Sequence, residues 1–286
     1  MKKKILLSVV GATMLSSTSL FADSEQYDSY NYIGFGVENV TYKEMGTLAD
    51  GTSFKSSVTI DSPVYTSGSL IKATDSFDFS IDAASTLSPT QGDEKWQHGD
   101  YLVQENKFDA VLSELKILVH YKMNNNHRFV FGPSYDMFTM KRHTYTNPAD
   151  GTEKLQDGTS ISLNEERIST LFGTAGYWYE SSPFSNGGMR IKANVGYSQP
   201  IVRDAANTSS EEVIFNSTTG YKVDAGAYLG FQMTKGLEIG FFGNYGFVQK
   251  TGADTTEVGG ETITWPENDL ETFRYGVNFV WNFSKK

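Results

Sequence analysis

The sequence predicts an all-β protein: a closed antiparallel transmembrane β-barrel of ten strands, with eight strands as the alternative. Three observations favour this class. Apolar and polar residues alternate along many segments, which is typical of strands whose two faces meet different surroundings. Aromatic residues make up 14% of the chain, and there are 27 glycines against 7 prolines. Finally, short and long connections alternate along the chain, as in barrels with short turns at one end and long loops at the other.

The N-terminal residues predict export. Lys2, Lys3 and Lys4 precede an apolar run, Ile5–Leu15, and small residues follow to Ala22. This order is typical of a signal peptide cleaved after Ala22, so residues 1–22 are expected to be removed and residues 23–286 to form a single barrel domain. The alternative, an uncleaved anchor, is disfavoured because the apolar run is well short of the ~20 residues that a spanning helix needs.

Composition excludes several classes of function. The net charge is −10, and removing three leader lysines leaves the mature chain at about −13, which argues against nucleic acid as a partner. The chain contains no cysteine, so it has no disulfide, no thiol chemistry and no Cys-based metal site. We expect no cofactor.

Most strands can be placed from their alternation, and four longer connections separate some of them. The segments expected as strands are 30–42, 54–60, 77–82, 108–122, 129–137, 161–179, 189–198, 221–233, 237–247 and 273–283. The facing of 161–179 is ambiguous because it ends in three consecutive aromatic residues, 177–179. The expected loops are Leu87–Asn106, Thr146–Ser160, Arg203–Glu212 and Lys250–Asp269. The expected short turns are Asn124–His127, Ser181–Gly188 and Thr234–Gly236.

Parity limits the strand count. The first strand rises from the periplasmic side, and the strand that begins near Phe108 must descend into the short turn at Asn124–His127. An even number of strands must therefore lie between them, and the clean alternation of Phe77–Asp82 favours ten strands over eight.

The last strand, Phe273–Phe283, alternates most clearly. Its odd positions are all large apolar or aromatic residues, and its even positions are mostly polar or glycine. At the end of an exported chain this pattern resembles the C-terminal assembly signal of bacterial outer-membrane β-barrel proteins. The resemblance implies an outer-membrane location, insertion by the barrel-assembly machinery, and contact with membrane lipid and lipopolysaccharide. The residues that carry it are Tyr275, Gly276, Phe279, Trp281 and Phe283.

A secreted β-sandwich is the alternative architecture, because it also has short strands and turn signals. It is disfavoured because the apolar rows are long, the opposite rows carry many charges, and tyrosine and tryptophan gather near strand ends. A bilayer favours amphipathic rings at both of its interfaces, whereas a sandwich core does not require them.

If the apolar rows face lipid, the opposite rows line the lumen. Their charges are of both signs, which suits either a narrow pore with a transverse field or an interior packed with ion pairs. The packed interior is favoured, and a wide channel is not expected at ten strands. The predicted lumen-lining residues are Glu38, Glu114, Lys116, His120, Lys122, Arg128, Asp136, Arg190, Lys192, Lys222, Asp224, Glu238 and Arg274.

An enzyme is the least favoured function. The chain has four histidines, His98, His120, His127 and His143, and none belongs to a recognisable nucleophile or metal motif. Ten-stranded outer-membrane proteases of the omptin type are of similar length, but their paired acidic and His/Asp residues cannot be placed on this sequence. No catalytic, cofactor-binding or metal-binding residue is predicted.

The predicted loops are rich in acidic residues, and two of them contain Trp96 and Trp265. The acidic loops could bridge divalent cations to lipopolysaccharide or could simply keep the rim solvated. The tryptophans could form adhesive contacts or pack within folded loops. We therefore expect a monomeric outer-membrane barrel with a structural or narrow porin-like role. The alternative is a surface-interaction protein that acts through its loops.

Overall fold

The computed structural model describes most of the chain between residues 29 and 283. The predicted signal peptide lies outside the described residues, as do residues 284–286 and the middle of the connections expected at 146–160, 181–188 and 203–212. Within the described part of the chain, no helix is long and apolar enough to cross a membrane. The described ranges are 29–47, 51, 53–146, 155–156, 159–160, 163–181, 188–207, 213–234, 236–258 and 261–283.

The described residues form strands of very unequal length. The strands are β1 (Ser29–Thr47), β2 (Ser53–Lys72), β3 (Phe77–Thr86), β4 (Gln91–His98), β5 (Tyr101–Lys122), β6 (His127–Thr146), β7 (Leu155–Gln156), β8 (Thr159–Ser160), β9 (Leu163–Glu180), β10 (Met189–Asn207), β11 (Val213–Asn216), β12 (Tyr221–Gln232), β13 (Leu237–Lys250), β14 (Asp254–Val258), β15 (Glu261–Trp265) and β16 (Glu267–Phe283).

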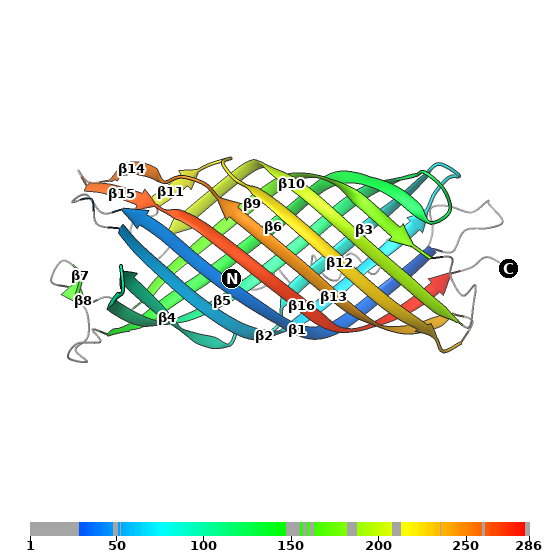
Figure 1. The fold of residues 1–286 in the computed structure, drawn as a ribbon, viewed down its shortest axis with the longest axis horizontal. Helices are drawn as coiled ribbons and strands as arrows, with labels where there is room; N and C mark the ends of the chain where they lie inside the picture. Colours follow the sequence, from blue (N-terminus) through cyan, green and yellow to red (C-terminus); the bar gives the residue numbers. More distant parts are fainter. Residues whose placement is uncertain are drawn as a thin grey trace, which may run out of the picture.

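Ten of these strands form a closed antiparallel ring. β1 pairs with β16 on one side and with β2 on the other, which joins the first strand to the last. The order around the ring is β1-β16-β13-β12-β10-β9-β6-β5-β3-β2, with β4 inserted between β2 and β5 at one end. The prediction of ten strands is therefore confirmed, and eight is excluded. Figure 1 shows the result, a long cylinder of strongly tilted strands.

The two ends of the cylinder differ. Tight turns such as Met123–Asn126 lie at the end where β1 begins and β16 ends, and His127 O accepts hydrogen bonds from the backbone N–H of Met123 and of Asn124. The small strands β4, β7, β8, β14 and β15 gather at the other end (Figure 1). Short turns face the periplasm in outer-membrane barrels, so we refer to the periplasmic and the extracellular end accordingly.

The expected loop at Leu87–Asn106 is wrong. The chain instead forms a β-hairpin in which β4 pairs with β5, turning at Gly99, whose φ of +58° is in the left-handed region. The sequence does not predict this hairpin because both of its faces carry charged residues, so hydrophobic and polar residues do not alternate along it. Asp93 and Lys107 form an outer ion pair, while Glu94 on the other face is fully buried.

Two further connections also contain more strand than expected. β10 continues to Asn207 and pairs with β11, so the loop expected from Arg203 is wrong. The acidic connection expected at Lys250–Asp269 contains the hairpin β14–β15, and β16 begins at Glu267. Trp265 is buried there against Phe215. Both hairpins are rich in polar and β-branched residues, so hydrophobic periodicity does not mark them.

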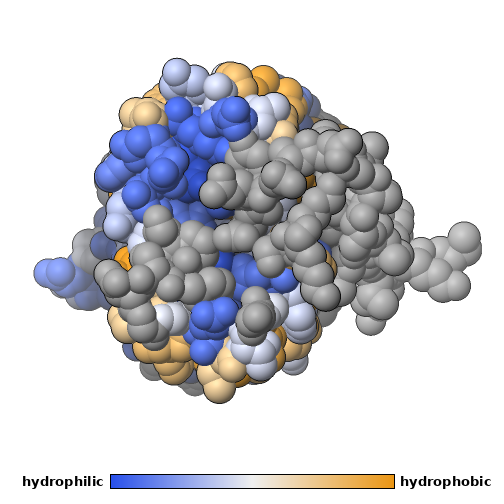
Figure 2. All heavy atoms as spheres, turned by 90° about the vertical axis from the view of Figure 1, so that its right-hand side faces the viewer, coloured by the Kyte–Doolittle hydropathy of each residue, from blue (hydrophilic) through white to orange (hydrophobic). Residues whose placement is uncertain are grey.

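An apolar belt surrounds the periplasmic half of the barrel. Register partners share a face, so the outward row of one strand continues into those of its neighbours. In the view along the axis from the periplasmic end, hydrophobic residues lie along parts of the outer edge and hydrophilic residues gather nearer the centre (Figure 2). The belt includes the outward residues Ile33, Phe35 and Val37 of β1, Phe77, Phe79 and Ile81 of β3, Ile117, Val119 and Tyr121 of β5, Phe129 and Phe131 of β6, Ile191, Ala193 and Val195 of β10, Phe241 of β13 and Phe273, Tyr275 and Phe279 of β16.

The barrel is much taller than this belt. A 22-residue strand such as β5, rising about 3.4 Å per residue and tilted by about 40°, extends about 55 Å along the axis, roughly twice the ~25 Å apolar band of an outer-membrane barrel. Beyond the belt the outer face becomes charged, with ion pairs such as Lys141–Glu165 at 3.4 Å and Lys95–Glu105 at 3.9 Å. We call the extracellular part, residues 39–47, 53–62, 91–112, 138–146, 163–170 and 267–271, the cap.

The hydrophobic pattern inverts between belt and cap. In β1 the apolar residues are outward at Phe35 and Val37 and inward at Val40 and Tyr42, so the phase shifts by one residue at Glu38. The cap therefore resembles a water-soluble barrel, polar outside and apolar inside. Its buried core, which we call the plug, consists of Val40, Tyr42, Val58, Ile60, Phe108, Ala110, Leu112, Phe138, Met140 and Leu270.

The seam between the first and last strands depends on two facing glycines, Gly36 and Gly276. A Cβ on Gly276 would lie 2.2 Å from Phe35 O, and one on Gly36 would lie 2.1 Å from Tyr275 O. These distances leave no room for a methyl group. The glycine in the assembly motif is thus required for closing the ring.

We therefore expect Gly276→Ala to reduce or abolish the heat-modifiable, folded band on a semi-native gel after refolding into detergent. Gly243→Ala is the matched control, because a Cβ there meets no atom within 4 Å. Equal folded fractions for the two variants would show that the seam tolerates a side chain.

Candidate functional site

The residues predicted to line the lumen lie inside the barrel. Glu38, His120 and Glu238 are completely buried, and Arg128 and Arg190 are almost so. The more exposed members, such as Lys116 with 18% of its side chain accessible, border an internal cavity. The interior is layered along the axis, from an ionic layer at the periplasmic end, through a second ionic group and a cavity, to the plug and a final ionic cluster in the cap.

The periplasmic layer joins charges from six strands. Arg128 pairs with Asp78 at 3.0 Å and with Glu180 at 3.2 Å. Arg190 bridges Glu180 at 3.2 Å and Glu238 at 3.1 Å. Lys122 also reaches Asp78, at 2.7 Å. The sequence did not identify Asp78 or Glu180, although each has the parity of the inward row of its strand.

Lys192 is the exception in this layer. Among the described residues, no carboxylate lies within 4 Å of its Nζ. The ammonium instead lies over two aromatic rings, 3.7 Å from the centroid of Tyr30 and 4.7 Å from that of Tyr228. Cation–π contact in a desolvated site contributes about 2 kcal/mol, which partly offsets the cost of burying the charge.

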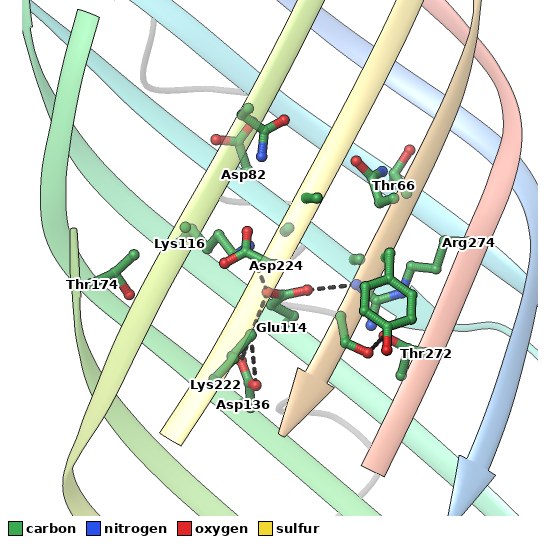
Figure 3. Close-up of a pocket in the computed structure, with 18 of the residues that line it drawn as sticks. Thr66, Asp82, Glu114, Lys116, Asp136, Thr174, Lys222, Asp224, Thr272 and Arg274 are labelled. Atoms are coloured by element: carbon green, nitrogen blue, oxygen red, sulfur yellow. Dashed lines mark hydrogen bonds and ion pairs between the residues drawn. The ribbon is translucent and has the colours of Figure 1, made fainter. Parts of the chain in front are cut away.

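The middle ionic group is organised by Glu114. Its carboxylate contacts Lys116 at 3.1 Å and Lys222 at 2.7 Å, and it also binds Arg274. Each cation has a second acidic partner. Lys116 binds Asp224 at 2.7 Å, Lys222 binds Asp136 at 2.8 Å, and Arg274 binds Glu38 across the seam. Figure 3 shows most of this group as a connected set of side chains from several strands.

The cap contains an ionic cluster that sequence reasoning missed. Arg142 binds Glu94 at 2.7 Å, Glu44 at 2.9 Å and Glu166 at 3.3 Å. The guanidinium also lies 5.3 Å from the ring centroid of Trp96. The signal was present, because Arg142 has the same even parity as the inward residues of β6, but the strand was expected to end before it.

A cavity of about 170 Å³ lies between the periplasmic layer and the plug. The charged walls are formed by the Glu114 group and by Asp82, and the polar walls include Asn194 and Asn244. The inward glycine Gly226 leaves room for these two asparagine side chains. A Cβ on Gly226 would lie 2.4 Å from Asn244 Oδ1 and 2.5 Å from Asn194 Oδ1.

One histidine lies within hydrogen-bond distance of a serine. His120 Nε2 is 2.9 Å from Ser80 Oγ, both residues are buried, and Trp178 packs edge-on against the imidazole. Nδ1 of His120 has no hydrogen-bond partner among the described residues, so none of them orients the ring as the third group of a hydrolytic triad does. Across the ranges that the structure describes, no group of three or more His, Cys, Asp or Glu residues could hold a metal ion.

No protein-family model and no curated protein sequence matches this chain. Its fold, however, is that of solved outer-membrane barrels. The outer membrane protease OmpT from Escherichia coli superposes with a TM-score of 0.66 at 11% identity, covering 93% of this chain and 100% of that one. Neisserial surface protein A (NspA) matches with a TM-score of 0.30 at 8% identity, covering 88% of this chain and 98% of that one. By fold, the chain is a closed antiparallel β-barrel of the kind found in bacterial outer-membrane proteins.

Proposed function

We propose that this protein is a structural outer-membrane barrel whose lumen does not conduct, and that it holds a rigid cap above the membrane. The main support for this proposal is the plug of buried apolar residues inside the cap. Tyr42 lies across the interior between Phe108, 6.0 Å away, and Phe138, 5.2 Å away, between ring centroids. These rings occupy the centre of the barrel at the level of the cap, where a conducting pore would have to contain water.

The ionic layers below the plug support the same function. Charges that select ions in a pore must remain accessible to the passing ion. Here Arg128, Arg190 and Glu238 are buried and bound to one another or to their neighbours. Small barrels are narrow enough for side chains to fill them, and this interior has that character.

Planar-bilayer recording tests the proposal. The wild-type protein is expected to give no resolved unitary steps. The triple variant Tyr42→Ala, Phe108→Ala, Phe138→Ala removes three plug rings and separates the two barriers: unitary steps would assign closure to the plug, and silence would assign it to the ionic layers. Phe35→Ala, on the lipid-facing surface, is the control and should stay silent. Unitary steps from the wild-type barrel would contradict the proposal and favour a narrow pore.

The cap also favours a second candidate function, contact with a partner at the cell surface. Tyr101 begins β5 at the tip of the β4–β5 hairpin and is 79% exposed, and Val103 beside it is 40% exposed. The outer rim thus presents an aromatic tip on a rigid hairpin. If the cap mediates attachment, Tyr101→Ser should reduce binding of cells to a surface without changing the folded fraction of the barrel.

The proposal includes no catalytic activity, no cofactor and a monomeric state. The burial of Ser80 and His120 supports the first of these. Lipid and lipopolysaccharide around the belt, and the barrel-assembly machinery during insertion, are the proposed partners. The apolar belt and the closing strand support them.

A further inference from the structure

We infer that the internal cavity binds a small organic ammonium ion, with Asp82 as its counter-charge. The inference goes beyond the structural role proposed above and does not depend on whether the lumen conducts.

The charges that line the cavity do not balance. Its lining contains the carboxylates of Asp82, Glu114, Asp136 and Asp224 and the cations Lys116, Lys222 and Arg274. Two adjoining buried charges of opposite sign, Glu38 bound to Arg274 and Lys192 near Asp82, cancel each other in the count. The lining therefore has one more anion than cations. This imbalance favours a single positive charge as the occupant.

The excess charge can be assigned to Asp82. The other three carboxylates all form ion pairs with cations of the lining. No Lys, Arg or His nitrogen lies within 4 Å of Asp82 in the ranges described, and its Oδ1 accepts a hydrogen bond from Tyr32 Oη at 2.8 Å. Figure 3 shows Asp82 apart from the connected group, without an ion pair to any side chain drawn. An ionised carboxylate in such an enclosed position is costly unless a cation accompanies it.

The chemistry of the walls selects an organic cation over a metal ion. The described residues provide no set of three or more acidic or histidine side chains around a common point, whereas a dedicated Ca²⁺ site usually gathers several carboxylates around the ion. The walls instead combine Asp82 with the aromatic residues Tyr32, Trp178 and Phe242. A carboxylate together with aromatic rings is the usual arrangement for binding ammonium groups.

The size and remaining polar groups fit the same class. A cavity of about 170 Å³ is comparable to the ~150 Å³ cavity known to hold one benzene molecule. The side-chain amides of Asn194 and Asn244 both lie beside Gly226 and line the cavity. They can bind a hydroxyl or an N–H group of the ligand, as the few polar groups of small-molecule sites do.

The test uses full-length mature protein refolded in detergent with choline or ethanolamine present, because the cavity is enclosed between the plug and the ionic layer. Binding is measured with the ligand still present, as a rise in the unfolding temperature by scanning calorimetry relative to protein refolded without ligand, and by the emission of Trp178, which lines the cavity. We expect at least one of the two ammonium ions to bind. The neutral isostere 3,3-dimethylbutan-1-ol should not bind.

Three variants make the test specific. Asp82→Asn should weaken binding at least tenfold, and Asp82→Glu should retain binding if the charge is what matters. Asp61→Asn is the matched control and should bind as the wild type does. The carboxylate of Asp61 lies on the outer face, where it accepts a hydrogen bond from Asn39. In Trp178→Phe the spectral change should disappear while the calorimetric signal remains.

Heat-modifiable gel mobility establishes that each variant is folded. The inference is overturned if neither ammonium ion binds the folded wild type, or if Asp82→Asn and Asp82→Glu both bind as the wild type does. Equal binding of Na⁺ or Mg²⁺ would also overturn it, in favour of an inorganic cation.

Discussion

Arg142→Met is expected to destabilise the cap by about 3–5 kcal/mol, the typical cost of removing one partner from a buried ion pair. Arg142 is the cation that binds Glu44, Glu94 and Glu166. The first two carboxylates are buried, so the substitution leaves their charges without a cation in a site that water does not reach. Methionine preserves much of the side-chain volume, which separates the electrostatic effect from a cavity effect.

Denaturant unfolding of the detergent-embedded barrel measures the total effect, and hydrogen exchange locates it. Exchange should accelerate in the cap, at residues 101–112 and 138–146, and should stay slow in the belt. Arg142→Lys keeps the charge but cannot form the forked contacts, so it should fall between methionine and the wild type. An unchanged unfolding midpoint for Arg142→Met would show that the three glutamates do not depend on this arginine.

Arg274→Met should destabilise the membrane half by a similar amount, about 3–5 kcal/mol. Arg274 and Glu38 are direct register partners on β16 and β1, so their ion pair spans the seam of the ring. Glu38 is completely buried, and its only other hydrogen bond that the structure defines comes from Thr86 Oγ1 at 2.8 Å. Without the arginine, the buried carboxylate of Glu38 therefore keeps only the hydrogen bond from the neutral hydroxyl of Thr86.

A double-mutant cycle tests the cause of that loss. If the unpaired charge is responsible, adding Glu38→Gln to Arg274→Met should recover part of the lost stability, because glutamine carries no charge. Additive destabilisation by the two changes would show that each residue acts through its other contacts. For Arg274 that other contact is its ion pair with Glu114.

The membrane half of the fold could be predicted because its physical pattern is local. Lipid lies outside and polar side chains lie inside, so every strand there alternates with period two. Phe273–Phe283, Met189–Ser198 and Ser113–Lys122 show this alternation without any knowledge of their neighbours. The inward positions of Glu114, Lys222 and Arg274 follow from the same periodicity.

The cap could not be predicted in the same way. Its strands reverse the pattern, with apolar residues such as Tyr42 and Phe138 facing inward. Assigning apolar residues to the outer face, which is right for the belt, therefore places the side chains of the cap on the wrong face. Its hairpins, such as β4–β5, carry charges on both faces, and the sequence therefore resembles a solvated loop. The pairing of Arg142 with Glu94, 48 residues away in sequence, results from contacts that no local pattern contains.

By itself the sequence determined an antiparallel membrane barrel with alternating strands, and parity limited it to eight or ten. Only the tertiary structure decided on ten, because the ring closes where Gly36 meets Gly276, and this depends on the register of two strands at opposite ends of the chain. The structure also decided which side chains meet inside the lumen. Periodicity reports which way a side chain points, whereas ion pairing and plugging depend on which side chains meet across the interior.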